Sequence, residues 1–474
     1  MRLSFHPGRL GALLLGALLL VLALHYGLPG LAGPSLAPAL PQDPYIQVYF
    51  NQSPAAAYTD PYRRIQRHGD DLEATIIEAI AAANTSVDVA VQEINLPRVA
   101  IALRDQAQAG VAVRIIVENQ YNRVWRPLES FQSEALDERQ QSRHSERQQL
   151  IDANRNGQLT AQELDQGDAI RILQKGNVPL LDDTADGSKG SGLMHHKFMV
   201  VDGRTVLLGS NNWTMSGTHG DFAHKDSRGN ANALLKINSA ELAAVLTEEF
   251  ELMWGDGPKG QEDSLFGLQK PARSPSIVSI PGSQVTVQFS PVSESQPWSQ
   301  SVNGLISTTL AQATSSIDLA LFVFSDQGIS DRLAPKSQAG VKVRALVDSH
   351  FIYRSYSEAL DMLGTAIPDH RCKYEAHNQP WAAPISQVGI PNLPEGDKLH
   401  HKFALIDNHT VTIGSHNWSA AANHTNDESL LVIRNPTVAA HFRRELARHA
   451  AAADMGLPKD LQNKIQRQRK QCGV

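Results

Sequence analysis

Residues 193–214 read LMHHKFMVVDGRTVLLGSNNWT, and residues 399–419 read LHHKFALIDNHTVTIGSHNWS. Both segments place a histidine, a lysine, an aspartate, a glycine–serine pair and an asparagine at the same offsets. The first set is His195, Lys197, Asp202, Gly209, Ser210 and Asn212, and the second is His400, Lys402, Asp407, Gly414, Ser415 and Asn417. A pattern of this length that recurs 205 residues later is hard to obtain by chance, and it indicates one active site built from two halves.

The hydrophobic pattern of each segment predicts two strands joined by a turn. Side chains alternate between the two faces of a strand, so His195 and Lys197 point to the same side. An apolar run follows, Asp202 and Gly203 form a hairpin-turn signal, and a second apolar run returns. The chain then turns so that Asn212 comes beside the histidine and the lysine. The same geometry applies to the second segment, and each half therefore delivers an imidazole, an ammonium, a hydroxyl and a carboxamide to one place.

The repeat is larger than the motif. Residues 83–118 parallel residues 313–348, with Ser86 matching Ser316 at an offset of 230 residues. Each block reads as helix, apolar strand, helix, glycine turn and apolar strand. Alternating strands and helices predict an α/β fold of two homologous α/β/α sandwich domains, each with a mostly parallel sheet covered by helices on both faces.

Composition shifts set the expected domain boundaries. The first domain is predicted at residues 44–254, a linker rich in Gly, Pro and Ser at 255–284, the second domain at 285–456 and a basic tail at 457–474. The offset between the repeats falls from 230 to 205 before the first motif, so the first half holds 25 additional residues there. The polar stretch at about 129–166 is the expected insertion.

The N-terminus carries a targeting signal. Arg2 and Arg9 precede an apolar run over residues 10–24, and this run is short for a membrane span but suits a signal peptide. Residues 1–33 are therefore expected to be a signal peptide or an N-terminal membrane anchor. We expect an exported protein, either periplasmic, extracellular or membrane-anchored and facing outward.

The totals describe a globular protein of 474 residues, with 42% hydrophobic and 19% charged residues. Its formal net charge of -6 excludes a chain that is basic as a whole, but it does not exclude a local basic groove. Cys372 and Cys472 could pair in an oxidising compartment or could be two unrelated thiols. No CxxC or Cys/His cluster indicates zinc.

A calcium site is predicted inside the insertion. The stretch DANRNGQLTAQE fits the EF-hand loop template D-x-[DN]-x-[DN]-G-x5-E without a mismatch. The expected oxygen ligands are Asp152, Asn154, Asn156, the Gln158 carbonyl, Thr160 and bidentate Glu163. Only two of them carry charge, so the affinity should be weak, at about 10⁻⁴ to 10⁻³ M. The alternative is an Asx-rich surface turn that opens a helix.

Two facing sets of these groups suit a phosphate diester. Lysine and amide N–H groups bind phosphoryl oxygens and stabilise the charge that develops there. One neutral imidazole can attack phosphorus while the other, protonated, gives its proton to the leaving oxygen. Water activated by the second histidine would then hydrolyse the phosphohistidine, and no catalytic cofactor or metal is needed.

The pattern H-x-K-x4-D-x6-G-S-x-N, present twice, resembles that of the phospholipase D superfamily. The resemblance covers nearly all of the chain after the export signal, apart from the insertion and linker. It implies two domains related by a pseudo-two-fold axis, with both motifs in one cleft at the interface. It also implies that His195 and His400 are the nucleophile and acid/base pair. Further roles are implied for Lys197, Lys402, Asn212 and Asn417 on the phosphate, Ser210 and Ser415 as supporting donors, and Asp202 and Asp407 as structural residues.

One departure from the family pattern bears on the mechanism. Members often have an acidic residue about twenty positions after the motif aspartate, hydrogen-bonded to a catalytic histidine, and Glu428 occupies that place in the second half. The first half has Asn232 instead. Since a carboxylate stabilises imidazolium more than an amide does, we expect His400 to be the better general acid and His195 the better nucleophile.

The motif does not distinguish a phospholipid from a nucleic acid. The export signal and acidic charge favour a phospholipase D-type enzyme acting on a phosphatidylcholine-like lipid, giving phosphatidic acid and the head-group alcohol. The ending GSxNW[ST] resembles an endonuclease branch, so an exported metal-independent nuclease is the alternative, and an envelope binding protein with a degenerate site is a third. The basic tail is a solvated face or a contact for anionic lipid or nucleic acid. Since both half-sites lie in one chain, a monomer is expected.

Overall fold

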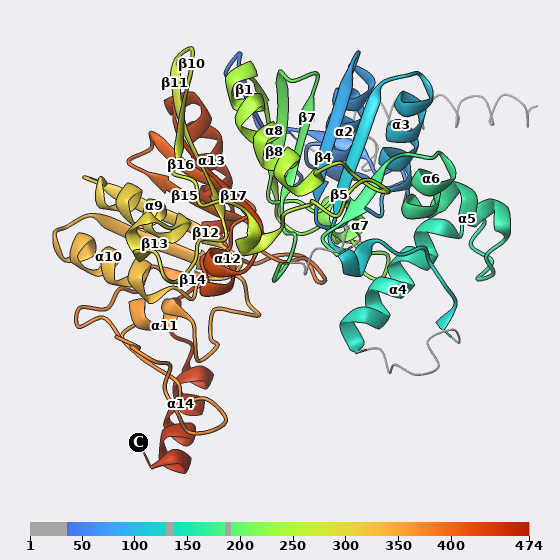
Figure 1. Cartoon of the computed structure of the whole chain (residues 1–474). Helices are drawn as coiled ribbons and strands as arrows, with labels where there is room; N and C mark the ends of the chain where they lie inside the picture. The colour runs from blue at the N-terminus through green and yellow to red at the C-terminus, as the bar shows by residue number, and fades with distance from the viewer. Residues whose placement is uncertain (1–35, 129–136, 185–190, 474) are drawn as a thin grey trace, which may run out of the picture.

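The computed structural model describes residues 36–128, 137–184 and 191–473 (Figure 1). The expected signal peptide or anchor at residues 1–33 lies outside them. Within the described ranges, no helix is both long and apolar enough to cross a membrane.

The first half of the chain forms a sheet in the order β1-β9-β8-β7-β4-β5-β6. Its strands are β1 (Ile46–Phe50), β4 (Ser86–Val91), β5 (Ala112–Val117), β6 (Leu180–Asp182), β7 (Lys197–Val201), β8 (Thr205–Gly209) and β9 (Ala233–Asn238). Helices α2 (Leu72–Ala81), α3 (Pro97–Gln108) and α6 (Ala169–Lys175) pack on one face, and α8 (Ala240–Trp254) packs on the other. A small separate sheet pairs β2 (Ala57–Thr59) with β3 (Gln66–His68).

The second half repeats this plan in the order β10-β11-β17-β16-β15-β12-β13-β14-β18. Its strands are β10 (Ser276–Ile280), β11 (Ser283–Ser290), β12 (Ser316–Leu321), β13 (Lys342–Val347), β14 (Val388–Ile390), β15 (Lys402–Ile406), β16 (Thr410–Gly414), β17 (Glu428–Arg434) and β18 (Asp454–Met455). Helices α9 (Val302–Ala311), α10 (Gln327–Gln338) and α11 (Glu358–Met362) cover the outer face, and α13 (Pro436–Ala450) covers the inner one.

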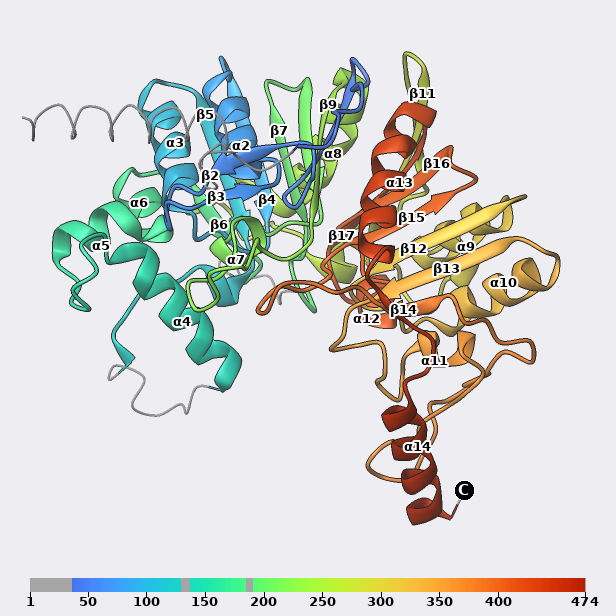
Figure 2. The same ribbon diagram turned by 180° about the vertical axis from the view of Figure 1, so that it is seen from behind.

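The two inner faces share one core. Side chains of both sheets join those of α8 and α13 in a single buried apolar cluster, so these helices form a central layer between the sheets (Figures 1 and 2). Helix α13 packs against β1 of the other half, and α8 packs against β10. The prediction of two α/β domains with a pseudo-two-fold arrangement is confirmed.

The sheets are mixed, so the prediction of mostly parallel sheets is wrong. In the first sheet only the β4–β5 and β5–β6 pairs are parallel, and in the second only β12–β13 and β13–β14. The other neighbouring strands run antiparallel, for example β7 against both β4 and β8. The motif itself is the cause, because each copy adds a hairpin, and a hairpin joins its strands antiparallel.

Each motif hairpin turns at the predicted place. Asp202 and Gly203 have φ values of 51° and 59°, and Asp407 and Asn408 have φ values of 51° and 53°. Two successive positive φ values match the right-handed twist of a tight hairpin, and Asp, Asn and Gly tolerate them best.

The linker in the structure is shorter than the predicted one, residues 255–284. Its C-terminal part forms β10 and the start of β11, which pair with each other, and β11 continues along β17. The Gly and Pro content of the stretch hid an alternating run, SIVSI, that buries Val278 and Ile280.

Two segments project from the two halves on the same side of the molecule (Figures 1 and 2). One is the insertion, with α4 (Glu138–Ile151) and α5 (Ala161–Gly167). The other is the predicted basic tail, which forms α14 (Lys459–Cys472). A disulfide joins Cys372 to Cys472, with their Cα atoms 5.3 Å apart, which answers the question that the sequence left open.

Candidate active site

The two motifs meet where the halves exchange backbone hydrogen bonds. The N–H of His195 donates to the carbonyl of Asp427 at 2.9 Å. The N–H of His400 donates to the carbonyl of Ala231 at 3.1 Å. His195 is therefore held against the segment that leads into β17, and His400 against the segment that leads into β9.

This exchange gives His195 a carboxylate partner from the other half. Glu428, the first residue of β17, lies with Oε2 2.6 Å from His195 Nδ1, and its side chain is fully buried. Asn426 Nδ2 donates to the other carboxylate oxygen at 3.2 Å. A carboxylate on Nδ1 holds the proton on that nitrogen and directs the Nε2 lone pair away from it.

His400 has an amide partner, again from the other half. Its Nδ1 lies 2.9 Å from Oδ1 of Asn232, the residue that precedes β9. The Asn232 oxygen also accepts from Ser210 Oγ at 2.8 Å, and its Nδ2 donates to the carbonyl of Gly217 at 2.9 Å. These contacts fix the amide with its oxygen toward His400.

The pairing expected from the sequence, with Glu428 on His400 of its own half, is therefore wrong. Sequence proximity suggested it, but β17 and β9 each deliver their partner residue across the interface. The expected ranking of the histidines stays a prediction, with a different physical basis. The carboxylate can stabilise the positive charge that His195 gains on forming a bond to phosphorus, whereas His400, beside a neutral amide, is a stronger acid once protonated.

Both motif lysines are buried beside the histidines. Lys197 Nζ donates to the His195 carbonyl at 2.8 Å, and Lys402 Nζ donates to the His400 carbonyl at 2.9 Å. Lys402 also lies over the Phe322 ring, 4.9 Å from its centroid. Burial lowers the pKa of Lys197 to about 7, with Glu428 opposing the shift, and lowers the pKa of Lys402 well below its usual range.

Burial and mutual repulsion disfavour the protonated forms of the histidines and lysines in the site. Burial, and then the Lys197 and Lys402 ammonium groups, hold the pKa of His195 well below its usual range, and the same two lysines act on His400. Burial raises the pKa of Glu428. An anion bound here would replace water around these cations and favour their protonated forms.

The serines and asparagines of the motifs take two different places. Ser210 Oγ bonds Asn232, and Ser415 Oγ accepts from the N–H of Ser429, next to Glu428. The serines thus brace the partners of the histidines. Asn212 and Asn417 have buried amide oxygens that bond to no other described residue.

The motif aspartates brace turns far from the chemistry. The Asp202 carboxylate accepts the backbone N–H groups of Asn84, Thr85 and Ser86, and Asp407 does the same for residues 314–316. These hydrogen bonds lower the pKa of both carboxyl groups against the effect of burial. Their geometry agrees with the structural role that the resemblance implies.

Sequence reasoning missed a second pair of carboxylates. Glu118 follows β5 and accepts the N–H of Met194 at 2.7 Å, and Asp348 follows β13 and accepts the N–H of Leu399 at 2.9 Å. Both fix the residue before a motif histidine. The signal was available, because the two carboxylates lie 230 residues apart and close the two repeat blocks.

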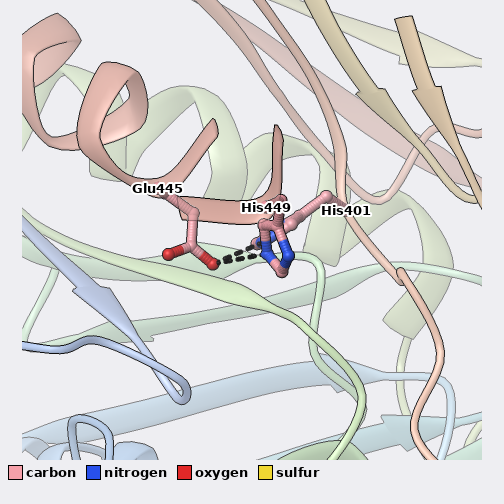
Figure 3. A group of neighbouring side chains, drawn as sticks. All are labelled: His401, Glu445 and His449. Carbon is pink, nitrogen blue, oxygen red and sulfur yellow. Dashed lines mark hydrogen bonds and ion pairs between the residues drawn. The ribbon is translucent and has the colours of Figure 1, made fainter. Parts of the chain in front are cut away.

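Each motif also has a second histidine, and this one bonds a glutamate of the central helices. His196 Nε2 lies 2.9 Å from Glu249 Oε1 on α8, and His401 Nε2 lies 3.1 Å from Glu445 Oε1 on α13. His449 reaches the same Glu445 oxygen at 2.9 Å (Figure 3). All of these side chains are buried.

The group His401, Glu445 and His449 has the spacing of a metal site, but its surroundings do not fit one. The Arg448 guanidinium lies 2.7 Å from Glu445 Oε1 and 2.8 Å from His449 Nε2. A metal ion there would face this cation at close range, and both Nδ1 atoms lack the partner that metal-bound histidines need. In the first half, Lys270 contacts the equivalent Glu249, so the glutamates are paired with protein cations in both halves.

The calcium loop predicted from the sequence lies between α4 and α5. Asp152 accepts the N–H groups of Asn156 and Gly157 at 3.1 and 2.7 Å, and Gly157 has a φ of 77°. Asn154 Nδ2 donates to Glu163 Oε1 at 2.8 Å, so the second and last predicted ligands face each other across one small loop. The oxygen-rich donor set fits a hard cation such as Ca²⁺.

Comparison with known proteins agrees with this geometry. The family model described as "Cardiolipin synthase, PLD-like domain" matches residues 76–254 and 306–450. The chain is similar to the mitochondrial cardiolipin hydrolases of Mus musculus (28% identical over 156 residues) and Homo sapiens (27% over 154). Both alignments cover 32% of this chain, and 60% and 52% of the relatives, so the chain spans little more than half the length of the curated relatives it matches.

A phospholipase D of Rickettsia felis is 27% identical over 137 residues, which cover 29% of this chain and 58% of that protein. The solved structure of phosphatidylserine synthase from Haemophilus influenzae aligns with 90% of this chain and 93% of its own, with a TM-score of 0.51 and 13% identity, a likeness of fold alone. The two segments matched by the family model make up more than half of the chain, and each contains one HxK motif. The chain therefore belongs to the phospholipase D superfamily.

Proposed function

We propose that this enzyme hydrolyses phospholipids through a phosphohistidine on His195. The observation that carries the proposal is the bond between His195 Nδ1 and Glu428 Oε2, at 2.6 Å. It keeps the Nε2 lone pair free to attack phosphorus and compensates the charge that the imidazole acquires. His400 has a neutral partner and serves as the acid.

The reaction then has two steps. Lys197, Lys402, Asn212 and Asn417 hold the non-bridging oxygens of the diester. His195 Nε2 forms a bond to phosphorus as the bond to the leaving oxygen breaks, and His400 gives that oxygen its proton. Neutral His400 next takes a proton from water, whose oxygen attacks phosphorus and breaks the N–P bond. The proton taken from water stays on His400, and the broken N–P bond leaves His195 neutral, so both histidines regain their starting states.

Phospholipid is the favoured substrate class. The relatives named above act, by their names, on cardiolipin or as phospholipase D, and the chain is acidic as a whole, with a net charge of -6. This support is compatible with a phosphatidylcholine-like lipid and with an anionic diester lipid. The GSxNW[ST] ending of both motifs favours the second candidate, an exported endonuclease.

One assay separates these candidates. Purified enzyme is incubated with vesicles of phosphatidylcholine or cardiolipin and with single- and double-stranded DNA. We expect phosphatidic acid and the released head-group alcohol from the lipid vesicles, and no cleavage of DNA. The reverse result would establish the nuclease. The His195→Ala variant is the control for contaminating activity, and it should be inactive on every substrate.

We further propose that Ca²⁺ braces the insertion without entering the reaction. Helix α4 packs at the edge of the site, where Asn95 Nδ2 donates to Glu146 Oε1 at 3.2 Å and Arg143 lies 3.7 Å from Glu93. Millimolar calcium should raise the melting temperature of the wild type and leave that of the Asp152→Asn, Glu163→Gln variant unchanged. In a chelator, activity should fall only in proportion to the fall in melting temperature. An equal shift in both proteins would reject the site.

We likewise propose that the protein is exported. The apolar run near the N-terminus and the Cys372–Cys472 disulfide support an oxidising compartment outside the cytoplasm. Because each half supplies one partner to the histidine of the other, we propose that a monomer is active. Fractionation of the producing cells, with thiol labelling of the recovered protein, tests the location, and light scattering tests the oligomeric state.

A further inference from the structure

Helix α14 has two opposite faces. Leu461 and Ile465 lie on one face and are buried. Lys464, Arg467 and Lys470, spaced three residues apart, follow the other face, and all three are exposed. They form no ion pair with any other residue in the described ranges. We call these three residues the basic stripe.

The rest of the protein holds this helix rigidly. Leu461 and Ile465 pack with Leu360 and Ile367 in a small separate core. Arg469 donates to the carbonyl of Ala366 at 3.0 Å, and the disulfide fastens the last helical residue, Cys472, to the loop at Cys372. A helix of this composition would be marginal alone, so its fixed position comes from this packing.

A chain of contacts links the base of the helix to the catalytic centre. Tyr353 packs against the core beneath α14, and its hydroxyl donates to the carbonyl of Gly456 at 3.4 Å. Two residues earlier, Phe351 contacts Phe322 with ring centroids 4.7 Å apart, and Phe322 contacts the His400 ring at 4.8 Å. Helix α14 therefore projects from the side of the molecule on which the site lies, as α4 does in the other half (Figures 1 and 2).

The charge of the helix opposes that of the chain. The helix carries five Lys or Arg residues and one Asp, whereas the whole chain has a net charge of -6. Arg371 and Lys373, on either side of Cys372, add exposed cations beside its C-terminal end. Tyr374 and Tyr356 are exposed in the adjoining loops. Lysine, arginine and tyrosine together are typical of proteins that rest on the head-group region of a bilayer.

We infer that the basic stripe of α14 docks the enzyme on a bilayer of anionic phospholipids, with the catalytic side toward the lipid. The inference rests on the proposed lipid substrate and adds the surface that brings the enzyme to it. The apolar face of the helix is already buried, so the contact is electrostatic and peripheral, without insertion. Each exposed cation near such a surface strengthens binding by a factor of about five, so three together contribute on the order of a hundredfold.

The test measures binding apart from turnover. Co-sedimentation with vesicles of phosphatidylcholine alone, or with about one third phosphatidylglycerol, is compared for three full-length proteins. They are the wild type, the stripe variant Lys464→Gln, Arg467→Gln, Lys470→Gln, and the control Arg204→Gln, Lys259→Gln, Lys342→Gln. The control also loses three exposed cations. Two of them, Arg204 and Lys342, lie at the ends of central strands that point away from the motif histidines. Hydrolysis of a soluble aryl phosphodiester is measured in parallel.

We expect the wild type and the control to bind anionic vesicles alike, salt to weaken that binding, and the stripe variant to lose it by roughly a hundredfold. All three should hydrolyse the soluble diester equally. Equal vesicle binding by the stripe variant, or equal binding of the wild type to neutral vesicles, would overturn the inference. Binding of the same three proteins to single-stranded DNA is also measured, and a stripe variant that loses binding to DNA while keeping its binding to vesicles would overturn the inference too. Failure of the proposed function would look different, because lipid would then bind without being cleaved.

Discussion

The two halves of this protein share a fold and a motif but surround their histidines differently. His195 of the first half contacts a carboxylate, Glu428, and His400 of the second half contacts a carboxamide, Asn232. Both partners come from the opposite half, by the same backbone exchange. The pseudo-two-fold axis therefore preserves geometry while a single difference in charge breaks the chemical symmetry.

This difference in charge explains how a duplicated site can give its two histidines different roles. A symmetric pair of histidines would compete for the same role, since either could attack phosphorus. One buried carboxylate favours cationic character on the imidazole beside it, whereas an amide leaves its imidazole more acidic. The asymmetry lies in partner residues outside the HxK motifs, which are alike in both halves.

The largest expected effect separates the two histidines. His195→Ala should reduce kcat by at least about 10⁴-fold and leave no phosphoenzyme, because the nucleophile is gone. His400→Ala should slow the first step by about 10²- to 10⁴-fold and the second step as well, because it removes both acid and base. With a diester whose leaving group needs no proton, the His400→Ala enzyme should accumulate phosphohistidine.

Rapid acid-free quenching and mass spectrometry of the labelled peptide distinguish these outcomes. The modified residue should be His195 in the wild type and in the His400→Ala enzyme. Phosphate found on His400 would reverse the roles of the two halves. Unchanged melting temperatures show that each variant is folded.

The next comparison concerns the partners. Glu428→Gln keeps the size of the side chain but removes the charge beside His195, and kcat should fall by about 10²- to 10⁴-fold. Asn232→Ala removes one neutral hydrogen bond to His400 and should cost only about tenfold. Steady-state kinetics on one soluble diester measure both.

Equal losses in the two variants would show that charge is not what distinguishes the halves. The Asn232→Asp enzyme sharpens the same point. A second carboxylate beside His400 would raise the pKa of that imidazole and make it a weaker acid. We therefore expect that enzyme to be slower with poor leaving groups than with good ones, unlike the wild type.

Much of the fold could be predicted because the repeat supplied two independent readings of one plan. The motif hairpins and their turns follow from apolar runs on both sides of Asp202 and Asp407. The parallel order of the sheets was overestimated, since a helix–strand alternation in one block says nothing about how the later hairpin joins it. The strand β10 was missed because its flanking Gly and Pro residues resembled a linker.

The site was predicted less completely, for a physical reason. The HxK residues are local in sequence, so their spacing revealed them. The partner of each histidine is a contact between halves, and no local pattern indicates which half supplies it. Glu428 was recognised as a partner and assigned to the wrong histidine. Glu249 and Glu445 were not recognised, because a single glutamate on a helix looks like any solvated residue.

Those helix glutamates provide a stability comparison. Glu249→Gln should lower the free energy of unfolding by about 3 kcal/mol, because it leaves the buried ammonium of Lys270 with Asp427 as its one remaining carboxylate. Glu445→Gln should cost less, since its cation, Arg448, is partly exposed and can be solvated. Urea unfolding of the two variants measures the difference.

The same experiment tests the conclusion about metal binding in the second half. A chelator should leave the unfolding midpoint of the wild type unchanged in the absence of calcium. A fall in the wild type, absent from Glu445→Gln, would mean that His401, Glu445 and His449 hold an ion after all.

The smallest effect is a shift in pH dependence. Burial lowers the pKa of Lys197 to about 7, and the charges of Glu428 and, after it, Glu93 oppose that shift. A dialkyl phosphate, a monoanion throughout the neutral range, should bind the wild type below this pKa and weaken as pH rises through about 7, when the ammonium group loses its proton. In Glu428→Gln the pKa of Lys197 falls further, so the weakening should begin at lower pH. Calorimetric titration at several pH values measures both transitions.

Asn232→Ala is the matched variant from the other half, and it should leave the transition where it is, because it removes no charge near Lys197. A shift of the same size in both variants would mean that the transition reports general loosening of the cleft. A shift in Glu428→Gln alone ties it to one carboxylate that enters the site from the second half and acts on the motif of the first. The charge difference between the halves would then govern the binding of the substrate anion as well as the roles of the two histidines.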